Sequence, residues 1–223
     1  MTTCPDATLR PKGWGCSAVD AQARAWAACC LAWAVLSLGF HALSGGAWEW
    51  RYDLAWGEPW RWWSAAWVHF GATHLAMNLA GCGVVAALGR AARLGSLWVW
   101  AWVLAWPLSH LGLLLHEPGL AFRGLSGVLH AGVAVASVAL IGAQDRRQRR
   151  WGGILAVGLA LKVLWELPQP GDWALGPGGD FVVATGAHVG GVLSGWAVAS
   201  ALAFKARGWR AASGPRPGPT MRE

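Results

Sequence analysis

The chain has 223 residues, of which 55% are hydrophobic and only 13% charged, and 19 are tryptophan. Soluble domains carry about one quarter charged residues, so this balance is typical of a membrane protein and excludes an ordinary soluble domain. The net charge of +7 could suggest nucleic-acid binding, but the basic residues flank apolar stretches and form no basic face on a folded domain. We therefore expect the lipid bilayer, and no nucleic acid, as a partner.

Six apolar stretches are candidates for helices that cross a bilayer, which takes roughly 17 to 25 residues. They cover residues 24–43, 68–88, 94–115, 124–142, 151–167 and 181–204. The first is long for the apolar core of a cleavable signal, so we expect it to remain as an anchor. The sequence thus predicts an all-α membrane protein with a six-helix domain over residues 24–204. A segment 1–23 precedes it, and a basic, disordered tail 205–223 follows.

The basic residues are distributed unequally between the two sides of such a bundle. With six crossings, 14 of the 18 fall on one side: Arg10, Lys12, Arg24, Arg90, Arg93, Arg146, Arg147, Arg149, Arg150, Lys205, Arg207, Arg210, Arg216 and Arg222. By the positive-inside rule, both termini are predicted to be cytoplasmic.

The connection after the first stretch is long and rich in tryptophan. It contains Trp48, Trp50, Trp56, Trp60, Trp62, Trp63 and Trp67. Tryptophan prefers the boundary between lipid and water, so we expect this loop to lie in the outer interface, with most of these rings forming an aromatic belt. Arg61 could brace the loop by pairing with Glu58 or with Glu49, and the sequence does not choose between them.

The second stretch opens with His69, His74 and Asn78. His74 and Asn78 are four residues apart and therefore share one helix face. Both can donate hydrogen bonds, which suits stabilisation of an oxyanion. The alternatives are a helix–helix hydrogen bond for Asn78 and an interfacial position for His69.

The fourth stretch begins with Gly124-Leu125-Ser126-Gly127. From Ser126 to Gly142 a helix would measure about 25 Å, less than the roughly 30 Å of hydrocarbon. Ser126 is therefore expected below the outer surface, at a helix start whose unpaired N–H groups require water or substrate. Taken alone, the motif is equally typical of small-residue helix packing.

The last stretch carries His188 on a stripe with Ala184, Gly191 and Gly195. The small residues allow a second helix to approach closely. If the helix starts near Phe181, His188 lies about 10 Å down, at the depth estimated for Ser126. A hydroxyl and an imidazole that meet are the minimum apparatus for acyl transfer to serine.

Other polar groups in the stretches bear on this hypothesis. His130, one turn after Ser126, could stack on or orient His188, or simply fill the core. Glu166 is the one carboxylate within the stretches, and we expect it to pair with Lys162 near the outer end of the fifth helix. The sequence therefore predicts a catalytic dyad without an acidic third member.

A metal site is the first alternative to this interpretation. His69, His74, His130 and His188 could surround a zinc or iron ion. The spacing His-x4-His is not that of zinc proteases, and no acid is placed to act as a base. We therefore expect neither a metal nor any other cofactor.

With these residues considered, the chain resembles the rhomboid family of intramembrane serine proteases over residues 48–204. The resemblance rests on four motifs in order: Trp60-Arg61, His69-x4-His74-x3-Asn78, Gly124-Leu125-Ser126-Gly127 and Ala187-His188-x2-Gly191-x3-Gly195. It implies Ser126 as nucleophile, His188 as base, and His74, Asn78 and the Ser126 backbone N–H as the oxyanion hole. It also implies that His69 supports the outer loop and that no cofactor is needed.

One position narrows the resemblance. Many rhomboids have tyrosine four residues after the serine, where this chain has His130. In this respect the chain resembles rhombosortases, a bacterial branch associated with proteins that end in a Gly-Gly motif, one spanning helix and a basic end. This implies a bacterial inner-membrane enzyme, open toward the periplasm, that releases such membrane-anchored proteins. The alternatives are a general rhomboid protease with other single-span substrates and a non-catalytic rhomboid-like module that binds membrane helices.

Overall fold

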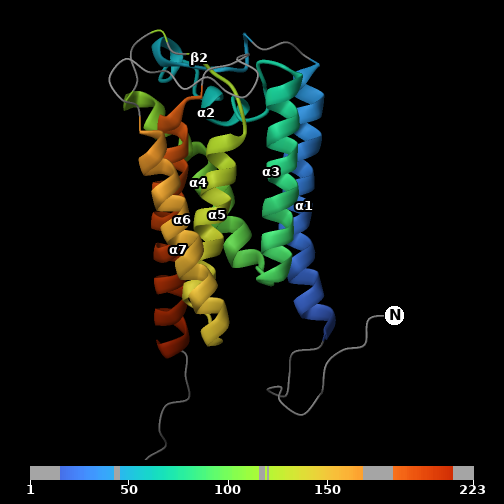
Figure 1. Cartoon of the computed structure of the whole chain (residues 1–223), viewed down its shortest axis with the longest axis vertical. Helices are drawn as coiled ribbons and strands as arrows, with labels where there is room; N and C mark the ends of the chain where they lie inside the picture. Colours follow the sequence, from blue (N-terminus) through green and yellow to red (C-terminus); the bar gives the residue numbers. More distant parts are fainter. Residues whose placement is uncertain (1–15, 43–45, 116–118, 120, 168–182, 213–223) are drawn as a thin grey trace, which may run out of the picture.

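The computed structural model describes residues 16–42, 46–115, 119, 121–167 and 183–212, and of residues 16–23 and 210–212 only the backbone. Within these ranges the chain is a bundle of long helices (Figure 1). The long helices are α1 (Cys16–His41), α3 (Ala72–Ala91), α4 (Ser96–Ser109), α5 (Ser126–Ile141), α6 (Arg146–Glu166) and α7 (Thr185–Ala212). Shorter elements gather at one end of the bundle, which we call the loop end because residues 46–71 lie there.

Each of the six apolar stretches corresponds to one long helix, with different ends. By length and composition, four helical segments of the described residues can cross a membrane: Arg24–His41, Ala72–Ala91, Ser96–Leu115 and Thr185–Trp209. Helix α5 is apolar but shorter, and α6 begins with basic residues, capped by Asp145, whose side chain accepts a hydrogen bond from the backbone N–H of Arg147.

The first and last helices extend beyond the apolar stretches identified in the sequence. Helix α1 starts at Cys16 rather than near residue 24, and α7 continues to Ala212, so residues 205–212 are helical rather than disordered. An apolarity criterion detects only the part of a helix that matches hydrocarbon, whereas helices continue beyond it with polar side chains. The rest of the expected tail, residues 213–223, lies outside the described residues.

The third stretch is not one regular helix. Helix α4 contains Pro107 and ends at Ser109, after which residues His110–Leu115 form the 3₁₀ helix η3. Proline has no backbone N–H and its ring crowds the preceding turn, which disfavours a regular helix at this point. The change brings η3 against α7, where a Cβ atom on Gly112 would collide with the carbonyl oxygen of Gly186.

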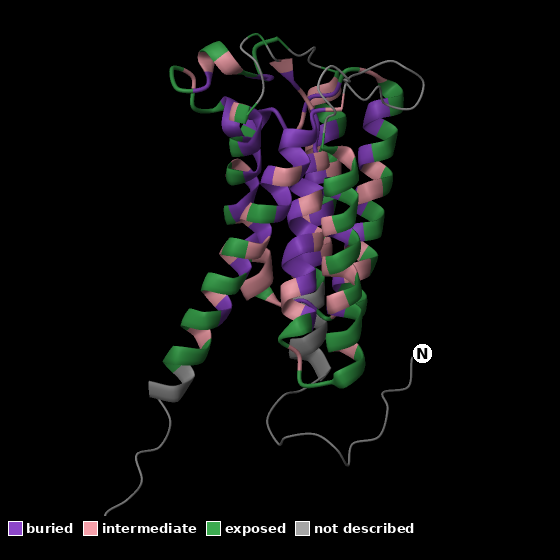
Figure 2. Ribbon diagram, turned by 60° about the vertical axis from the view of Figure 1, so that its left-hand side comes forward, coloured by how far each residue is buried: buried purple, intermediate pink, exposed green. Residues whose placement is uncertain are grey.

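Helix α5 lies at the centre of the bundle and packs against α3, α4, α6 and α7. Figure 2 shows its surface largely buried, while the outer faces of the peripheral helices are exposed. Trp102 of α4 donates from Nε1 to the carbonyl of Val128 at 2.7 Å and stacks on Trp26 of α1, with ring centroids 4.6 Å apart. Both tryptophans are fully buried, so aromatic packing ties α1 and α4 to the central helix.

The contact between α5 and α7 depends on glycine, as the small-residue stripe predicted. A Cβ atom at Gly195 would lie 2.6 Å from the carbonyl oxygen of Ala131, and one at Gly191 would collide with the carbonyl oxygen of Gly127. A Cβ at Gly127 would in turn lie 2.8 Å from the carbonyl oxygen of Ala187. With glycine at these positions no Cβ atom keeps the two backbones apart, so the helices approach each other closely.

The tryptophan-rich loop is a folded cap rather than a belt alone. It contains strand β1 (Trp50–Arg51), the 3₁₀ helix η2 (Tyr52–Leu54) and the short helix α2 (Arg61–Ser64), and β1 pairs antiparallel with β2 (Ala121–Phe122). Trp56, Trp60 and Trp63 are exposed, in agreement with an interfacial position, but Trp50 and Trp62 are buried inside the protein. Those two rings therefore do not belong to the aromatic belt that was predicted for most of the seven, because residue preference alone does not distinguish lipid from a protein interior.

Candidate active site

Ser126 and His188 meet, as the sequence hypothesis required. Ser126 is the first residue of α5 and His188 lies in the first turn of α7, with Ser126 Oγ 2.9 Å from His188 Nε2. Helix α7 starts at Thr185 rather than near Phe181, so His188 is closer to the helix start than expected. His188 is buried, whereas Ser126 is partly exposed, which leaves the hydroxyl within reach of a substrate.

His130 stacks on His188, one of the roles considered for it. The ring centroids are 4.1 Å apart and the ring planes differ by 17°. The Nδ1 atom of His130 lies 2.7 Å from the carbonyl oxygen of Ser126, and since a carbonyl only accepts, Nδ1 carries the proton. His130 is therefore oriented by the backbone of the serine residue itself and supports one face of the neighbouring imidazole.

The structure places a carboxylate against His188, a contact that the prediction of a dyad did not include. Glu166, the last residue of α6, places Oε2 at 2.9 Å from Nδ1 of His188, while its Oε1 accepts from Lys162 Nζ at 2.6 Å. The Lys162–Glu166 pair was correctly predicted, but a carboxylate has two oxygens and the second contacts the histidine. The available signal was position, because Glu166 ends one helix and His188 begins the next.

His74 and Asn78 lie beside the backbone that leads into Ser126. A Cβ atom on Gly124 would lie 2.7 Å from Cε1 of His74 and 3.7 Å from Nδ2 of Asn78. Gly124 also has φ = +132°, a conformation that residues with a side chain rarely adopt. Two separate constraints, backbone conformation and space, therefore favour glycine here, and both bring the α3 side chains next to the serine turn.

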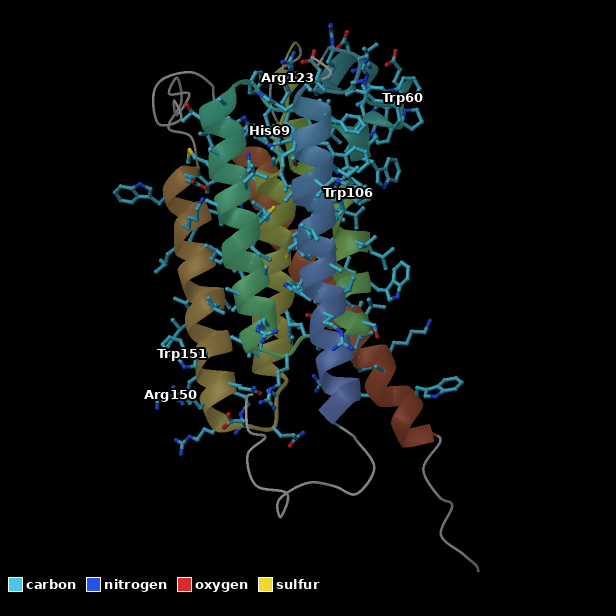
Figure 3. All side chains as sticks on the ribbon, turned by 90° about the vertical axis from the view of Figure 1, so that its right-hand side faces the viewer. Trp60, His69, Trp106, Arg123, Arg150 and Trp151 are labelled. Carbon is cyan, nitrogen blue, oxygen red and sulfur yellow. The ribbon has the colours of Figure 1, made fainter. Side chains whose placement is uncertain are left out.

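His69 lies next to His74 rather than in the loop alone. Its buried ring packs edge-on against the His74 ring, with centroids 5.1 Å apart. Figure 3 shows His69 at the same end of the bundle as Arg123, opposite Arg150 and Trp151. His69 thus connects the cap to the α3 face that carries His74 and Asn78.

The structure settles the alternative for Arg61. Its guanidinium is buried and forms the ion pair with Glu58, Nε to Oε2 at 2.6 Å, and it also donates from Nη1 to the backbone carbonyls of Glu49 at 2.7 Å and Gly46 at 3.0 Å. Its neighbour Trp60 is exposed and donates from Nε1 to the carbonyl of Ala47 at 3.5 Å. Arg61 therefore holds together residues 46–61 of the cap.

We expect Arg61→Met to destabilise the protein by on the order of 2 to 4 kcal/mol, because it leaves the buried carbonyl of Glu49 without its donor and Glu58 without its ion-pair partner. The unfolding midpoint in detergent measures the loss. Arg51→Met is the matched control, since Arg51 pairs with Asp53 at 3.0 Å on the exposed surface, where such a pair contributes little to stability. Equal effects of the two substitutions would contradict a special role for Arg61.

The segment that leads into Ser126 is attached to the cap at several points. The carboxylate of Glu49 does not pair with Arg61 but accepts a hydrogen bond from Arg123 Nε at 2.7 Å. Arg123 also lies over the Phe70 ring, 5.1 Å from its centroid. The backbone N–H of Gly124 donates to the carbonyl of Ala65 at 2.9 Å. Together with the β1–β2 pairing, these contacts set the position of the serine turn; the sequence contained no local signal for them.

One group of potential metal ligands occurs among the described residues: His130, Glu166 and His188, whose ligand atoms lie within 4.8 Å of one another. It shares only two members with the four histidines considered from the sequence. Because the His130 and His188 rings stack nearly in parallel, the lone pairs of their nitrogens lie in two separate, nearly parallel planes. They therefore do not converge on one ion. Both ring nitrogens of His188 also already have partners, which disfavours metal coordination in this arrangement.

Comparison with known proteins identifies the sequence family. The family model described as the Rhomboid domain matches residues 56–204, a range that includes Ser126, His188 and Glu166. No curated protein matches the chain.

Proposed function

The chain belongs to the rhomboid family of intramembrane serine proteases, and from this premise we propose that it is an active serine endopeptidase. As a family member with apolar helices, it is an integral membrane protein. The observation that carries the proposal is the 2.9 Å contact between Ser126 Oγ and His188 Nε2 at the start of α5. A hydroxyl bonded to the unprotonated nitrogen of an imidazole is the arrangement that nucleophilic catalysis by serine requires.

In the proposed reaction Ser126 Oγ attacks the carbonyl carbon of the scissile peptide bond. Its proton passes to Nε2 of His188, which then delivers it to the departing amine as the C–N bond breaks. Water deacylates the enzyme through the same imidazole and restores Ser126. The proton that leaves the nucleophile is thus the proton that the leaving group receives, and the cycle needs no further reactant.

The tetrahedral intermediate places a negative charge on the former carbonyl oxygen. We assign its stabilisation to the backbone N–H of Ser126 together with donors from His74 and Asn78, which lie beside Gly124. The N-cap residue of α5, Leu125, makes no capping hydrogen bond with its side chain, and the first N–H groups of a helix have no partner within the helix. They and the positive end of the helix dipole are therefore free to act on an oxyanion.

We further propose that all six long helices cross the membrane, with both termini cytoplasmic and the loop end at the periplasmic face of a bacterial inner membrane. The supporting observations are the position of Arg150 at the end opposite Arg123 and the shortness of α5. At 1.5 Å per residue, the 16 residues of α5 measure about 24 Å, so Ser126 would lie below the outer surface in a hydrated hollow.

The substrate class follows from the rhombosortase-like His130, which stacks on His188. We propose membrane-anchored proteins with a C-terminal Gly-Gly motif, one spanning helix and a basic end. The basic end would stay in the cytoplasm by the positive-inside rule, which places the Gly-Gly motif near the outer end of the helix and hence at the depth proposed for Ser126.

The test is co-expression of the full chain with a substrate that carries such a tail, followed by mass spectrometry of the released end. We expect cleavage by the wild type and none by Ser126→Ala, and a fluorophosphonate probe should label only the wild type. A substrate in which alanines replace the Gly-Gly motif tests the substrate class separately. Cleavage that persists in Ser126→Ala would refute the serine mechanism, and equal cleavage of both tails would favour a general rhomboid protease.

A further inference from the structure

The carboxylate of Glu166 joins the end of α6 to the histidine at the start of α7. The contacts form a continuous chain: Lys162 Nζ to Glu166 Oε1 at 2.6 Å, Glu166 Oε2 to His188 Nδ1 at 2.9 Å, and His188 Nε2 to Ser126 Oγ at 2.9 Å. We propose that Glu166 is a positioning residue that holds His188 in the tautomer and orientation needed to accept the Ser126 proton. This inference rests on the proposed serine mechanism.

The hydrogen-bond roles follow from the carboxylate. An ionised carboxylate only accepts, so Nδ1 of His188 must carry a proton to form the 2.9 Å contact. A neutral imidazole has one N–H, and Nε2 is then an acceptor that faces Ser126 Oγ. Without the carboxylate, the proton could reside on Nε2, where it would prevent the ring from taking the serine proton.

Lys162 fixes the carboxylate without competing for the histidine. Lys162 lies one helical turn before Glu166 and donates to its Oε1 atom, which leaves Oε2 for Nδ1 of His188. The side chain of Glu166 is 24% exposed and that of Lys162 is 45% exposed, and the ion pair between them favours the ionised carboxylate, whose other oxygen faces a buried ring. Together with the His130 stack, this restrains both rotation and tilt of the imidazole.

The same contact would stabilise the reaction intermediate. When Nε2 takes the proton of Ser126, His188 becomes an imidazolium, and its positive charge then lies between the carboxylate of Glu166 and the developing oxyanion. Glu166 keeps its charge throughout, because the Nδ1 proton stays on the ring. Glu166 therefore affects the rate without gaining or losing a proton itself, and the bonds made and broken in the reaction stay the same.

The experiment compares Glu166→Gln with Lys162→Met in the full chain, measuring kcat and KM for a cleaved substrate and the rate of fluorophosphonate labelling. Both substitutions break the same ion pair, but only the first replaces the carboxylate that contacts His188 by an amide, which can also donate to Nδ1. We expect Glu166→Gln to lower kcat on the order of 10-fold to 100-fold with little change in KM. This is less than the roughly 10⁴-fold loss for a fully buried triad carboxylate, because Glu166 is partly exposed. Lys162→Met should lower kcat less than Glu166→Gln does, because Oε2 of Glu166 keeps its contact with Nδ1 of His188.

A second measurement separates this inference from the proposed function. NMR spectra of protein with ¹⁵N-labelled histidine report the Nδ1–H signal of His188, which is assigned by its loss in His188→Ala. This signal should be present in the wild type and in Lys162→Met but absent or moved in Glu166→Gln. An unchanged signal and rate in Glu166→Gln, or equal losses in both variants, would overturn the positioning role while Ser126 labelling still supports the protease. If the wild type is not labelled, the protease proposal fails, and the tautomer signal alone decides the role of Glu166.

Discussion

Replacing His188 by alanine is expected to lower kcat for substrate cleavage by at least about 10³-fold, with a much smaller change in KM. The hydroxyl of Ser126 loses the acceptor 2.9 Å away, and general base catalysis by a positioned side chain contributes roughly 10²-fold to 10⁴-fold to a rate. The fold should survive, because Glu166 keeps its ion pair with Lys162 when the imidazole is removed. Rates of cleavage and of fluorophosphonate labelling measure the effect.

His130→Ala is the matched control for that substitution. It removes an imidazole from the same cluster, but one that contacts the Ser126 carbonyl and the face of the His188 ring. We expect a loss on the order of 10-fold, since the base remains but is less restrained. If His188→Ala retained more activity than His130→Ala, the assignment of the base would have to be reversed.

Replacing Gly191 by valine is expected to abolish cleavage and to destabilise the protein by on the order of 3 kcal/mol. A Cβ atom there collides with the carbonyl oxygen of Gly127, and backbone does not move aside as a side chain would. Helices α5 and α7 must separate, and with them the two residues whose contact the mechanism needs. The unfolding midpoint in detergent and the cleavage rate should therefore fall together.

The control for crowding is Gly83→Val, the same substitution on the spanning helix α3. A Cβ atom at Gly83 meets nothing within 4 Å, and the residue is exposed. Valine has a lower helix propensity than alanine but a higher one than glycine, so this variant should fold and cleave like the wild type. Stability that fell equally in both variants would mean that valine in a spanning helix, rather than the α5–α7 contact, causes the loss.

Local chemistry explains why much of the helical core was predictable. Long apolar stretches have few structural alternatives in a membrane protein, and all six became helices. The glycine stripe around His188 predicted a close helix contact, because absence of side chains is a property of the residues themselves. Helix ends were less accurate, as with the start of α1 and the end of α7, since a helix does not end where its apolar segment ends.

The cap was the least predictable part. Whether Trp50 is buried and Trp56 exposed depends on which segment folds over each ring, and the β1–β2 pairing joins residues about 70 positions apart in the chain. Composition correctly indicated an unusual tryptophan-rich loop at one end of the bundle. It contained no information on which rings would pack against protein, because the same apolar surface suits both lipid and a protein interior.

The residue types and their spacing were sufficient to predict that Ser126 and His188 meet, since polar groups are rare in spanning helices and each has few possible functions. The partners of the long charged side chains were decided only by the packing of the helices. Glu166 contacts His188, Glu49 contacts Arg123 and Arg61 contacts Glu58, because those groups lie within bonding distance once the helices and the cap are assembled. Flexible side chains of this length can reach several neighbours, so distances in space, rather than positions in the chain, select among them.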